Sequence, residues 1–310
     1  MQLVSDQELR ELENSVKGEL KYNTPMSEHT TYNIGGPAYI YALPVDKDDV
    51  KTLMEFASEH QLPHFNLGGG SNILVHDKGY QGLIIDLKKG FNSIEVEGNI
   101  VKAQSGVSLA RFVSTCRKHN LAGVEKLAGI PGSLGGALFM NAGAFGSEIS
   151  QRLKSLSLLL ENGEFLELRA IELQFEYRES NLPEGAIILE SEFELEQVED
   201  ASELYGSSRD IVKERNVKQP VTLPSTGSIF KNPEEGDSAG KLIEDAGLKG
   251  TRAGGAMISD KHANFIVNVG KAKAEDVMHL IALAQKTVQD KFGVELELEL
   301  KLVGFEEWFI

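Results

Sequence analysis

Glycines gathered at two places in the chain constrain its fold more than any other sequence feature. The longer group has six glycines among the 18 residues from 129 to 146, interleaved with apolar side chains. The shorter group, Gly68–Gly70, lies between two predicted strands and is followed by Ser71 and Asn72. Because glycine has no Cβ, its backbone N–H groups can converge closely on an anion. Each group alone is also typical of a tight turn or a close helix–strand junction, but together they predict a site for a nucleotide-like anion.

Motifs and composition exclude several classes of protein. Neither glycine group contains GxxxxGK[ST] or GxGxxG, so neither a Walker-type phosphate loop nor a Rossmann dinucleotide site is expected. The 47 acidic residues exceed the 31 basic ones, which argues against binding to nucleic acid or to an anionic membrane. No apolar run approaches the roughly 20 residues that span a bilayer. Cys116 is the only cysteine and the seven histidines lack metal-binding spacings, so we expect no disulfide, no metal and a cytoplasmic protein.

Hydrophobic periodicity predicts a mixture of helices and strands. Helices are expected at residues 5–16, 46–60, 109–119, 202–216, 238–246 and 274–292. Strands are expected at residues 39–43, 65–67, 73–75, 83–86, 93–96, 100–103, 186–195, 255–258, 264–268 and 294–303, with a further hairpin around Asn162-Gly163. In the last of these strands Glu295, Glu297 and Glu299 share one face. Because the elements show no strict βαβ repeat, the predicted class is α+β.

The length of the chain predicts more than one domain. A chain of 310 residues exceeds the usual size of a single domain, so two packed units are expected. Residues 198–202 form a polar, acidic connector, and we place the boundary there. The predicted organisation is an N-terminal helix within residues 1–20, a first domain over residues 21–200 and a smaller second domain over residues 201–310.

Five motifs occur in an order that resembles one enzyme family. They are LGGGSNILV, AGIPGSLGGALFMNAGAFG, EYRES, TGSIFKNP and FGVELELELKLVG, and the similarity runs from about residue 32 to residue 304. The chain is similar to the UDP-N-acetylenolpyruvoylglucosamine reductases, which make UDP-N-acetylmuramate for peptidoglycan and so serve cell-wall biogenesis, cell shape and division. The resemblance implies a FAD-binding domain of the vanillyl-alcohol-oxidase type over residues 21–200, followed by a substrate-binding domain. It also implies noncovalent FAD, NADPH as electron donor and a UDP-sugar as substrate.

The same resemblance assigns residues to the site. It implies that FAD is held by the two glycine groups through Gly68, Gly69, Gly70, Ser71, Asn72, Gly129, Ile130, Pro131, Gly132, Ser133, Gly135, Gly136, Asn141, Ala142 and Gly143. The catalytic residues it implies are Arg178, Ser228 and Glu299. The substrate-binding residues it implies are Tyr177, Lys218, Lys231, Asn232 and His262.

Each catalytic assignment suits the reduction of an enol ether that carries a carboxylate. The guanidinium of Arg178 would pair with that carboxylate as negative charge grows on it. Ser228 would give a proton to carbon, helped by a cationic neighbour such as Lys231. Glu299 would orient the carboxylate or a water. Without the resemblance, a surface ion pair, a turn hydroxyl and a solvated strand face would be the simpler interpretations of these three residues.

Two departures from the family pattern affect these assignments. Leu298 stands where the family often has proline, which leaves Glu297 as an alternative to Glu299. Lys218 follows Arg178 by only 40 positions, too few for the tyrosine-bearing loop of the longer subclass, so the chain resembles the shorter subclass. Two other functions stay open, namely a sugar or alcohol oxidase of the same fold and a non-catalytic sugar-nucleotide-binding module. The sequence does not fix the oligomeric state, and a monomer is the preferred expectation.

Overall fold

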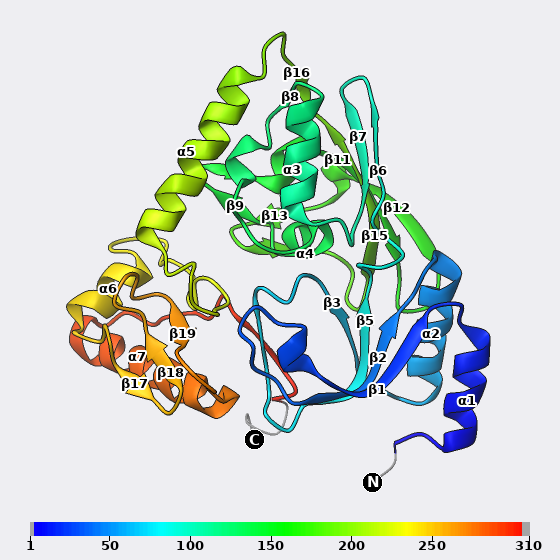
Figure 1. The fold of residues 1–310 in the computed structure, drawn as a ribbon, viewed down its shortest axis with the longest axis horizontal. Helices are drawn as coiled ribbons and strands as arrows, with labels where there is room; N and C mark the ends of the chain where they lie inside the picture. The colour runs from blue at the N-terminus through cyan, green and yellow to red at the C-terminus, as the bar shows by residue number, and fades with distance from the viewer. Residues whose placement is uncertain (1–2, 306–310) are drawn as a thin grey trace. The chain divides into compact units, whose positions relative to one another are not determined.

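The computed structural model describes residues 3–305, which divide into two compact units (Figure 1). The first unit contains the residues up to 22, residues 40–69 and residues 82–212. The second contains residues 23–39, residues 70–81 and the chain from residue 213 onward. The units are therefore interleaved along the sequence, which differs from the consecutive blocks 21–200 and 201–310 that were expected.

A four-stranded sheet leads into the first glycine group. Its strands are β1 (Glu19–Pro25), β2 (Pro37–Leu43), β5 (Tyr80–Asp86) and β3 (His64–Leu67), in that order. Strand β3 runs parallel to β5 and pairs as far as Leu67, so the chain leaves the sheet at Gly68. Helices α1 (Asp6–Ser15) and α2 (Lys47–Glu59) contact each other, and the side chains of Ser5 and Asp46 cap their first turns.

A five-stranded antiparallel sheet supports the second glycine group. Its order is β12 (Phe165–Arg169), β11 (Leu153–Leu159), β15 (Ile187–Glu194), β7 (Ile100–Gln104) and β6 (Ile94–Glu97). Helix α3 (Leu109–Lys118) begins after the Ser108 cap and buries Phe112. The centres of the Phe112 and Phe193 rings lie 4.7 Å apart. Helix α4 (Leu134–Phe139) contacts α3 and β7 and buries Leu134 and Leu138 in the same core. The hydrophobic core therefore anchors the part of the glycine group that forms α4.

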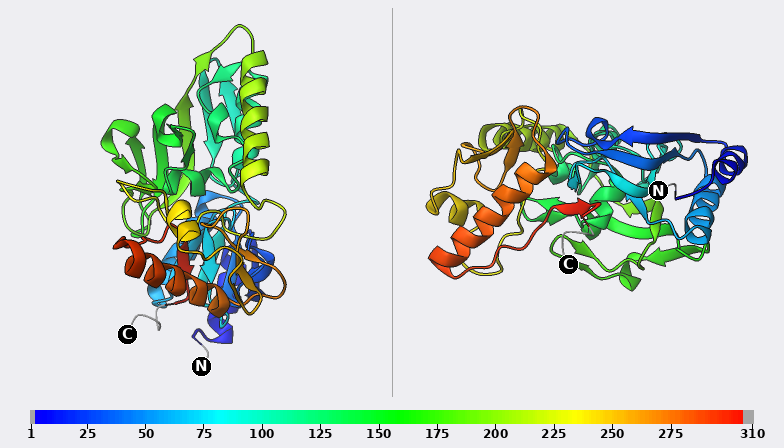
Figure 2. Two further views of the ribbon diagram at one scale, coloured as in Figure 1. Left: turned by 90° about the vertical axis from the view of Figure 1, so that its left-hand side faces the viewer. Right: turned by 90° about the horizontal axis from the view of Figure 1, so that it is seen from below.

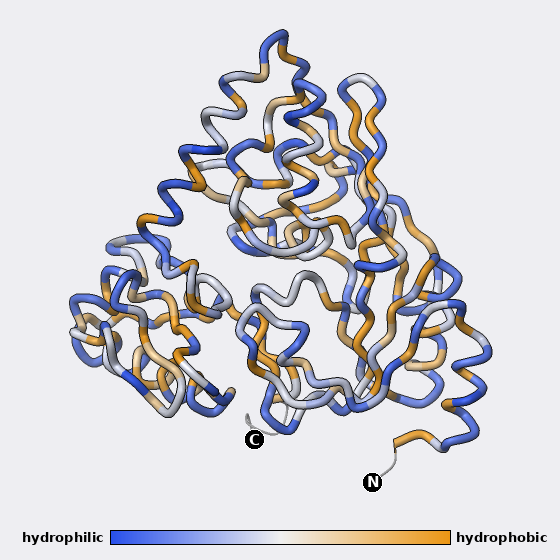
Figure 3. Tube along the Cα trace, viewed as in Figure 1, coloured by the Kyte–Doolittle hydropathy of each residue, from blue (hydrophilic) through white to orange (hydrophobic). Residues whose placement is uncertain are grey.

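Short strand pairs complete the first unit. They are β8 (Leu121–Ala122) with β16 (Glu196–Gln197), β9 (Gly143–Ala144) with β10 (Ser147–Glu148), and β13 (Phe175–Glu176) with β14 (Glu179–Ser180). Short 3₁₀ helices lie at η2 (Glu125–Leu127), η3 (Ile149–Arg152) and η4 (Ala170–Glu172), and a further one, η1 (Met26–Glu28), belongs to the second unit. Helix α5 (Ser202–Lys218) follows and is largely hydrophilic along its length (Figure 3).

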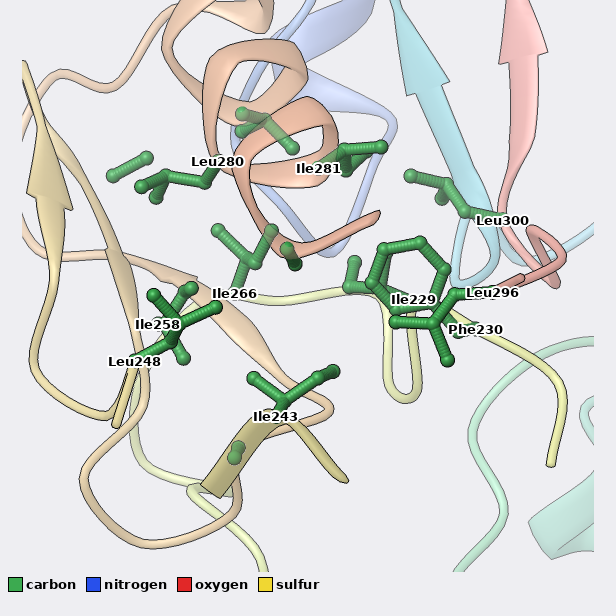
Figure 4. Close-up of a cluster of buried hydrophobic side chains, with 14 of the residues drawn as sticks. Ile229, Phe230, Ile243, Leu248, Ile258, Ile266, Leu280, Ile281, Leu296 and Leu300 are labelled. Carbon is green, nitrogen blue, oxygen red and sulfur yellow. The ribbon is translucent and has the colours of Figure 1, made fainter. Parts of the chain in front are cut away.

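The second unit packs a three-stranded antiparallel sheet against a long helix (Figures 1 and 2). The sheet consists of β17 (Arg252–Ala253), β18 (Ala256–Ile258) and β19 (Ile266–Asn268). Helix α7 (Ala274–Phe292) contacts β17, β18 and the short helix α6 (Ala239–Asp245). Figure 4 shows the core between them, where Ile229, Ile258 and Leu280 are among the buried side chains. Gly293 ends α7 in the left-handed conformation, at φ 70°.

Long-range pairing assigns two early segments to the second unit. Strand β4 (Ile73–Val75) pairs in parallel with β20 (Lys301–Val303). The hydroxyl of Tyr32 donates to the carbonyl of Ile266 across 2.9 Å. The carboxylate of Asp77 accepts from the backbone N–H groups of Ala274 and Glu275, at 2.9 and 3.1 Å, and so caps the N-terminus of α7. The partners in each pair lie about 200 or more residues apart in the sequence, so local periodicity could not predict these contacts.

Most of the expected helices and strands are present, and one is wrong over most of its length. Residues 294–303 were expected to form a strand, but only Lys301–Val303 do so, and Leu298 makes an isolated bridge with Phe230. Within residues 3–305, no helix is long and apolar enough to cross a membrane. The same residues contain no group of three side chains placed to hold a metal ion.

Candidate active site

The first glycine group is not a hairpin turn. Strand β3, before it, pairs with β5, whereas β4, after it, pairs with β20. Two strands joined by a hairpin would pair with each other. The turn interpretation of Gly68–Gly70 is therefore excluded. Gly70 itself has a φ of 64°, and a Cβ there would lie 2.1 Å from the carbonyl oxygen of His29.

The two glycine groups pack directly on each other within the first unit. A Cβ built on Gly69 would lie 2.5 Å from the Cα of Gly132, and one on Gly68 would lie 3.0 Å from the Oγ of Ser133. A Cβ on Gly135 would lie 2.8 Å from the Cβ of Ser105. Gly69 thus packs backbone against backbone, whereas Gly68 and Gly135 pack against the side chains of Ser133 and Ser105. Their lack of a side chain does not by itself indicate a bound ligand.

Gly136 is different, because it has room beside it. A Cβ there would meet the Oγ of Ser133 at 3.4 Å and the Cα of Gly68 at 3.8 Å, which are ordinary contacts. Ser133 caps α4, and its Oγ accepts from the Gly136 N–H across 3.2 Å. The fold of the protein therefore does not explain why this position lacks a side chain. Close approach of a ligand to the backbone of α4 would explain it.

Buried polar atoms near the glycine groups lack protein partners. Among residues 3–305, the Oγ of Ser105, the Oδ1 of Asn66 and the Oδ1 of Asn141 are buried without a hydrogen-bond partner. Ser105 contacts the second glycine group directly, since its carbonyl accepts from the Gly135 N–H at 3.0 Å. Buried polar atoms are normally paired, so the unpaired atoms of Ser105 and Asn66 fit a polar ligand held against the glycines. Ser105 and Asn66 were not found from the sequence, where no motif marks them.

The remaining residues expected to hold a cofactor have varied local roles. Gly129 and Gly132 have φ values of 79° and 122°, which suit glycine, and they shape the turn before α4. That turn also contains Ile130 and Pro131, while Asn141, Ala142 and Gly143 follow α4. Asn72 belongs to the second unit and donates from Nδ2 to the carbonyl of Glu299 across 3.0 Å. One of its side-chain donors is therefore already used to hold the C-terminal segment.

Arg178 lies in the turn of a short hairpin in the first unit. Strands β13 and β14 pair Glu176 with Glu179, and Tyr177 and Arg178 form the turn between them. Arg178 has a φ of 63°, an unusual value for a residue with a side chain. Its guanidinium donates to the carbonyl of Gly143 across 3.0 Å and lies 4.8 Å from the centre of the Tyr177 ring. The hairpin thus directs Arg178 toward the second glycine group.

Ser228 and Glu299 lie on neighbouring stretches of chain in the second unit. The N–H of Glu299 donates to the carbonyl of Ile229 across 2.9 Å, and the N–H of Lys231 donates to the carbonyl of Glu297 across 2.9 Å. Residues 229–231 therefore pair with residues 297–299. This pairing brings Ser228, at the start of one stretch, near the end of the other that carries Glu299.

The same pairing places Glu299 and Glu297 in different surroundings. Glu299 is half-buried, whereas Glu295 and Glu297 are exposed. The carboxylate of Glu297 lies 2.5 Å from the Nζ of Lys231, so these two form an ion pair. Lys231 therefore forms an ion pair with Glu297, whereas the sequence suggested that it would assist Ser228. The half-buried Glu299 remains the better candidate for a catalytic carboxylate.

Three expected substrate-binding residues have partners within the second unit. The Nζ of Lys218 lies 2.6 Å from Glu214, one helical turn earlier. The Oδ1 of Asn232 accepts from the N–H of Ala239 at the start of α6. Burial, with a contribution from the nearby charge of Lys249, lowers the pKa of His262 below its ordinary value. The imidazole is thus neutral near neutral pH and would act as a hydrogen-bonding group, not as a cation.

Comparison with known proteins decides the family. Residues 38–169 match the FAD binding domain family, and residues 219–303 match the C-terminal domain of UDP-N-acetylenolpyruvoylglucosamine reductase. The UDP-N-acetylenolpyruvoylglucosamine reductase of Chloroherpeton thalassium is 41% identical, over 98% of this chain and 99% of its own. That of Clostridium novyi is 44% identical over 94% of each chain. The chain belongs to the UDP-N-acetylenolpyruvoylglucosamine reductase family.

A solved member of the reductase family has the same fold. The crystal structure of the reductase from Thermus caldophilus matches with a TM-score of 0.80 and 34% identity, covering 93% of this chain and 99% of the other. The expected class is confirmed, namely an α+β protein with a FAD-binding domain of the vanillyl-alcohol-oxidase type and a substrate-binding domain. The protein is accordingly a FAD-dependent oxidoreductase. The buried Oγ of Ser105, with the open face of Gly136, fits that cofactor.

Proposed function

We propose that the protein reduces UDP-N-acetylenolpyruvoylglucosamine to UDP-N-acetylmuramate with electrons from NADPH, a step in making peptidoglycan precursors. The observation that carries this proposal is the similarity to reductases of that name, which spans nearly the whole chain at 41–44% identity. The product is a nucleotide sugar with no anchor, and we expect the reaction to take place in the cytoplasm.

When bound, FAD would supply the hydride-transfer chemistry that connects NADPH with the β-carbon of the enol ether. Within this chain, the glycine groups and the polar side chain of Ser105 would hold FAD. The open space beside Gly136 would let the cofactor lie against the backbone of α4, and the apolar residues between the glycines are suited to its rings. Carbonyl, hydroxyl and amide groups of the protein would make only noncovalent contacts with it.

Arg178 would bind the carboxylate of the substrate. Addition of hydride at the β-carbon moves negative charge through the α-carbon into that carboxylate. A guanidinium pairs with both carboxylate oxygens and stabilises the growing charge, whereas water would have to reorganise around it. The hairpin turn and the carbonyl of Gly143 restrict the conformations of Arg178, which lowers the cost of holding it there.

Ser228 would then donate its proton to the α-carbon. A serine hydroxyl is a weak acid, so the step depends on the negative charge that Arg178 has concentrated on the substrate. Glu299 would orient the substrate or a water near Ser228, which suits its half-buried position and its backbone pairing with Ile229. Lys231, paired with Glu297, would hold this stretch of chain and add local positive charge.

The UDP part of the substrate needs local cations and donors on a chain this acidic. We assign this role to Lys218 and Asn232, with His262 as a neutral hydrogen-bonding group and Tyr177 as an exposed ring beside Arg178. The enzyme is proposed to act as a monomer, which light scattering of the purified protein checks.

Turnover measurements test the proposal. Purified protein should be yellow and should oxidise NADPH only when the enolpyruvyl sugar nucleotide is present. Mass spectrometry should show a product heavier than the substrate by two hydrogens. Oxygen-dependent oxidation of a sugar or an alcohol, without any need for NADPH, would instead indicate an oxidase. A colourless protein that binds the sugar nucleotide but no FAD would indicate a binding module.

A further inference from the structure

Three hydrogen bonds join the hairpin of Arg178 to the segment that follows α4. We call residues 175–180 the arginine hairpin and residues 139–143 the support segment. The Oγ of Ser180 donates to the carbonyl of Phe139 across 2.7 Å. The Nδ2 of Asn141 donates to the carbonyl of Glu176 across 2.9 Å. The guanidinium of Arg178 donates to the carbonyl of Gly143 across 3.0 Å. Alternate residues of the support segment thus contact the start, the turn and the end of the hairpin.

The contact made by Asn141 is the central one of the three, and its side chain is the most constrained. Its side chain is fully buried, and its backbone has a φ of 41°. The second hydrogen of Nδ2 is donated to the Oε2 of Glu148 across 3.0 Å. Both amide hydrogens are therefore used, which fixes the orientation of the amide. A side chain held in this way defines where the carbonyl of Glu176 lies.

The arginine hairpin needs such external support. Its two strands contribute only two residues each, and isolated hairpins of that size are unstable in water. Arg178 adopts a left-handed backbone conformation that most residues avoid. A strained turn on a short hairpin keeps one geometry only when surrounding groups hold it. The bond from Asn141 acts two residues before Arg178, on the strand that leads into the turn.

We propose that Asn141 is a positioning residue for Arg178. Its amide fixes the strand before the turn, so that the guanidinium is held ready for the carboxylate of the substrate. The role rests on the proposed function, and it differs from contact with the cofactor, which the resemblance suggested for this residue. The hydrogen bonds to Glu176 and Glu148 are both donated by the amide nitrogen of Asn141. The amide oxygen takes no part in holding the hairpin.

The test removes the side chain without straining the backbone. Asn141→Gly keeps the left-handed conformation accessible and deletes the amide. Asn120→Gly is the matched control, because Asn120 also has a positive φ, of 56°, in the same unit but outside the hairpin and its support. Both variants are compared with the wild type in FAD content, in flavin reduction by NADPH and in reoxidation by the enolpyruvyl substrate. Hydrogen exchange of a peptide covering residues 173–182 reports directly on the hairpin.

Asn141→Gly should retain FAD and be reduced by NADPH at the wild-type rate. Its reoxidation by substrate should slow by on the order of tenfold to a hundredfold, the range expected when a catalytic group is displaced. Hydrogen exchange of the 173–182 peptide should become faster, whereas Asn120→Gly should match the wild type in every assay. Wild-type reoxidation in Asn141→Gly would overturn the proposal. A wild-type protein that fails to turn over at all would instead overturn the proposed function.

A double-mutant cycle separates positioning from a general structural role. If Asn141 acts through Arg178, Asn141→Gly should add little to the defect of Arg178→Ala. Equal fold losses in the presence and absence of Arg178 would overturn the proposal. If the glycine variant purifies without FAD, the same assays are applied to Asn141→Ser, which keeps one donor. Loss of FAD from both variants would place Asn141 in the cofactor site and would also overturn the proposal.

Discussion

Gly136→Ala tests whether α4 meets a ligand, because this substitution separates ligand contact from packing. A methyl group at Gly136 would make only ordinary contacts, at 3.4 Å to the Oγ of Ser133 and 3.8 Å to the Cα of Gly68. Replacing a helical glycine by alanine typically stabilises a protein by about 0.5–1 kcal/mol. We therefore expect the apoprotein of Gly136→Ala to be as stable as the wild type or more stable, by up to about 1 kcal/mol. If FAD lies against this backbone, the same methyl should weaken FAD binding by roughly tenfold or more, about 1.4 kcal/mol.

Gly69→Ala is the contrasting variant. Its methyl would lie 2.5 Å from the Cα of Gly132, so one of the two glycine groups must move. Overpacking of this kind typically costs about 1–3 kcal/mol, and we expect that loss in the apoprotein as well as in the FAD complex. Urea unfolding of the apoproteins and quenching of flavin fluorescence on titration measure the two effects separately. Wild-type FAD affinity in a stable Gly136→Ala would refute the reasoning, because α4 would then have no ligand beside it.

Three further predictions concern Arg178, Ser228 and Cys116. Arg178→Lys keeps the charge but loses the planar fork, so turnover should fall by about tenfold or more with FAD content unchanged, while the exposed Arg169→Lys should behave as wild type in the same steady-state assay. Ser228→Ala should be reduced normally by NADPH but reoxidised by substrate about 10²–10⁴ times more slowly in anaerobic stopped flow, with partial recovery in Ser228→Cys. Unaltered reoxidation would assign the proton to another donor, with Glu299 the first to examine. Burial raises the pKa of Cys116 to about 12, so the thiol should resist alkylation at pH 8 in the folded protein and react on unfolding, as mass spectrometry can show.

Local sequence patterns predicted most of the helices because the causes of helix formation are local, but they did not predict α4 within the second glycine group. In the structure, a capping box of Ser5 and Glu8 begins α1 and a left-handed Gly293 ends α7, and both are features of neighbouring residues. The final strand was predicted too long because an alternating apolar pattern indicates which side chains are buried. It does not show that the same residues pair with another strand. Leu296 and Leu300 are buried and residues 297–299 make backbone hydrogen bonds to residues 229–231, but only residues 301–303 form a ladder with a neighbouring strand.

The parts that sequence could not predict depend on contacts between distant residues. The interleaving of the two units follows from pairs such as Asp77 with the N-terminus of α7, and nothing near Asp77 in the sequence marks it as a cap. The glycine groups were recognised, but their close packing on each other was visible only in the fold. The role of Asn141 was likewise hidden, because the carbonyl it holds belongs to Glu176, 35 positions away.

An anaerobic titration shows whether the flavin passes electrons from NADPH to the sugar nucleotide. Protein carrying FAD is first bleached with one equivalent of NADPH under argon, and UDP-N-acetylenolpyruvoylglucosamine is then added while the flavin absorbance is followed. Our account predicts that the oxidised flavin spectrum returns fully after one equivalent of the substrate, with UDP-N-acetylmuramate as the product. A flavin that stays reduced until oxygen is admitted, with the sugar nucleotide unchanged, would contradict the account.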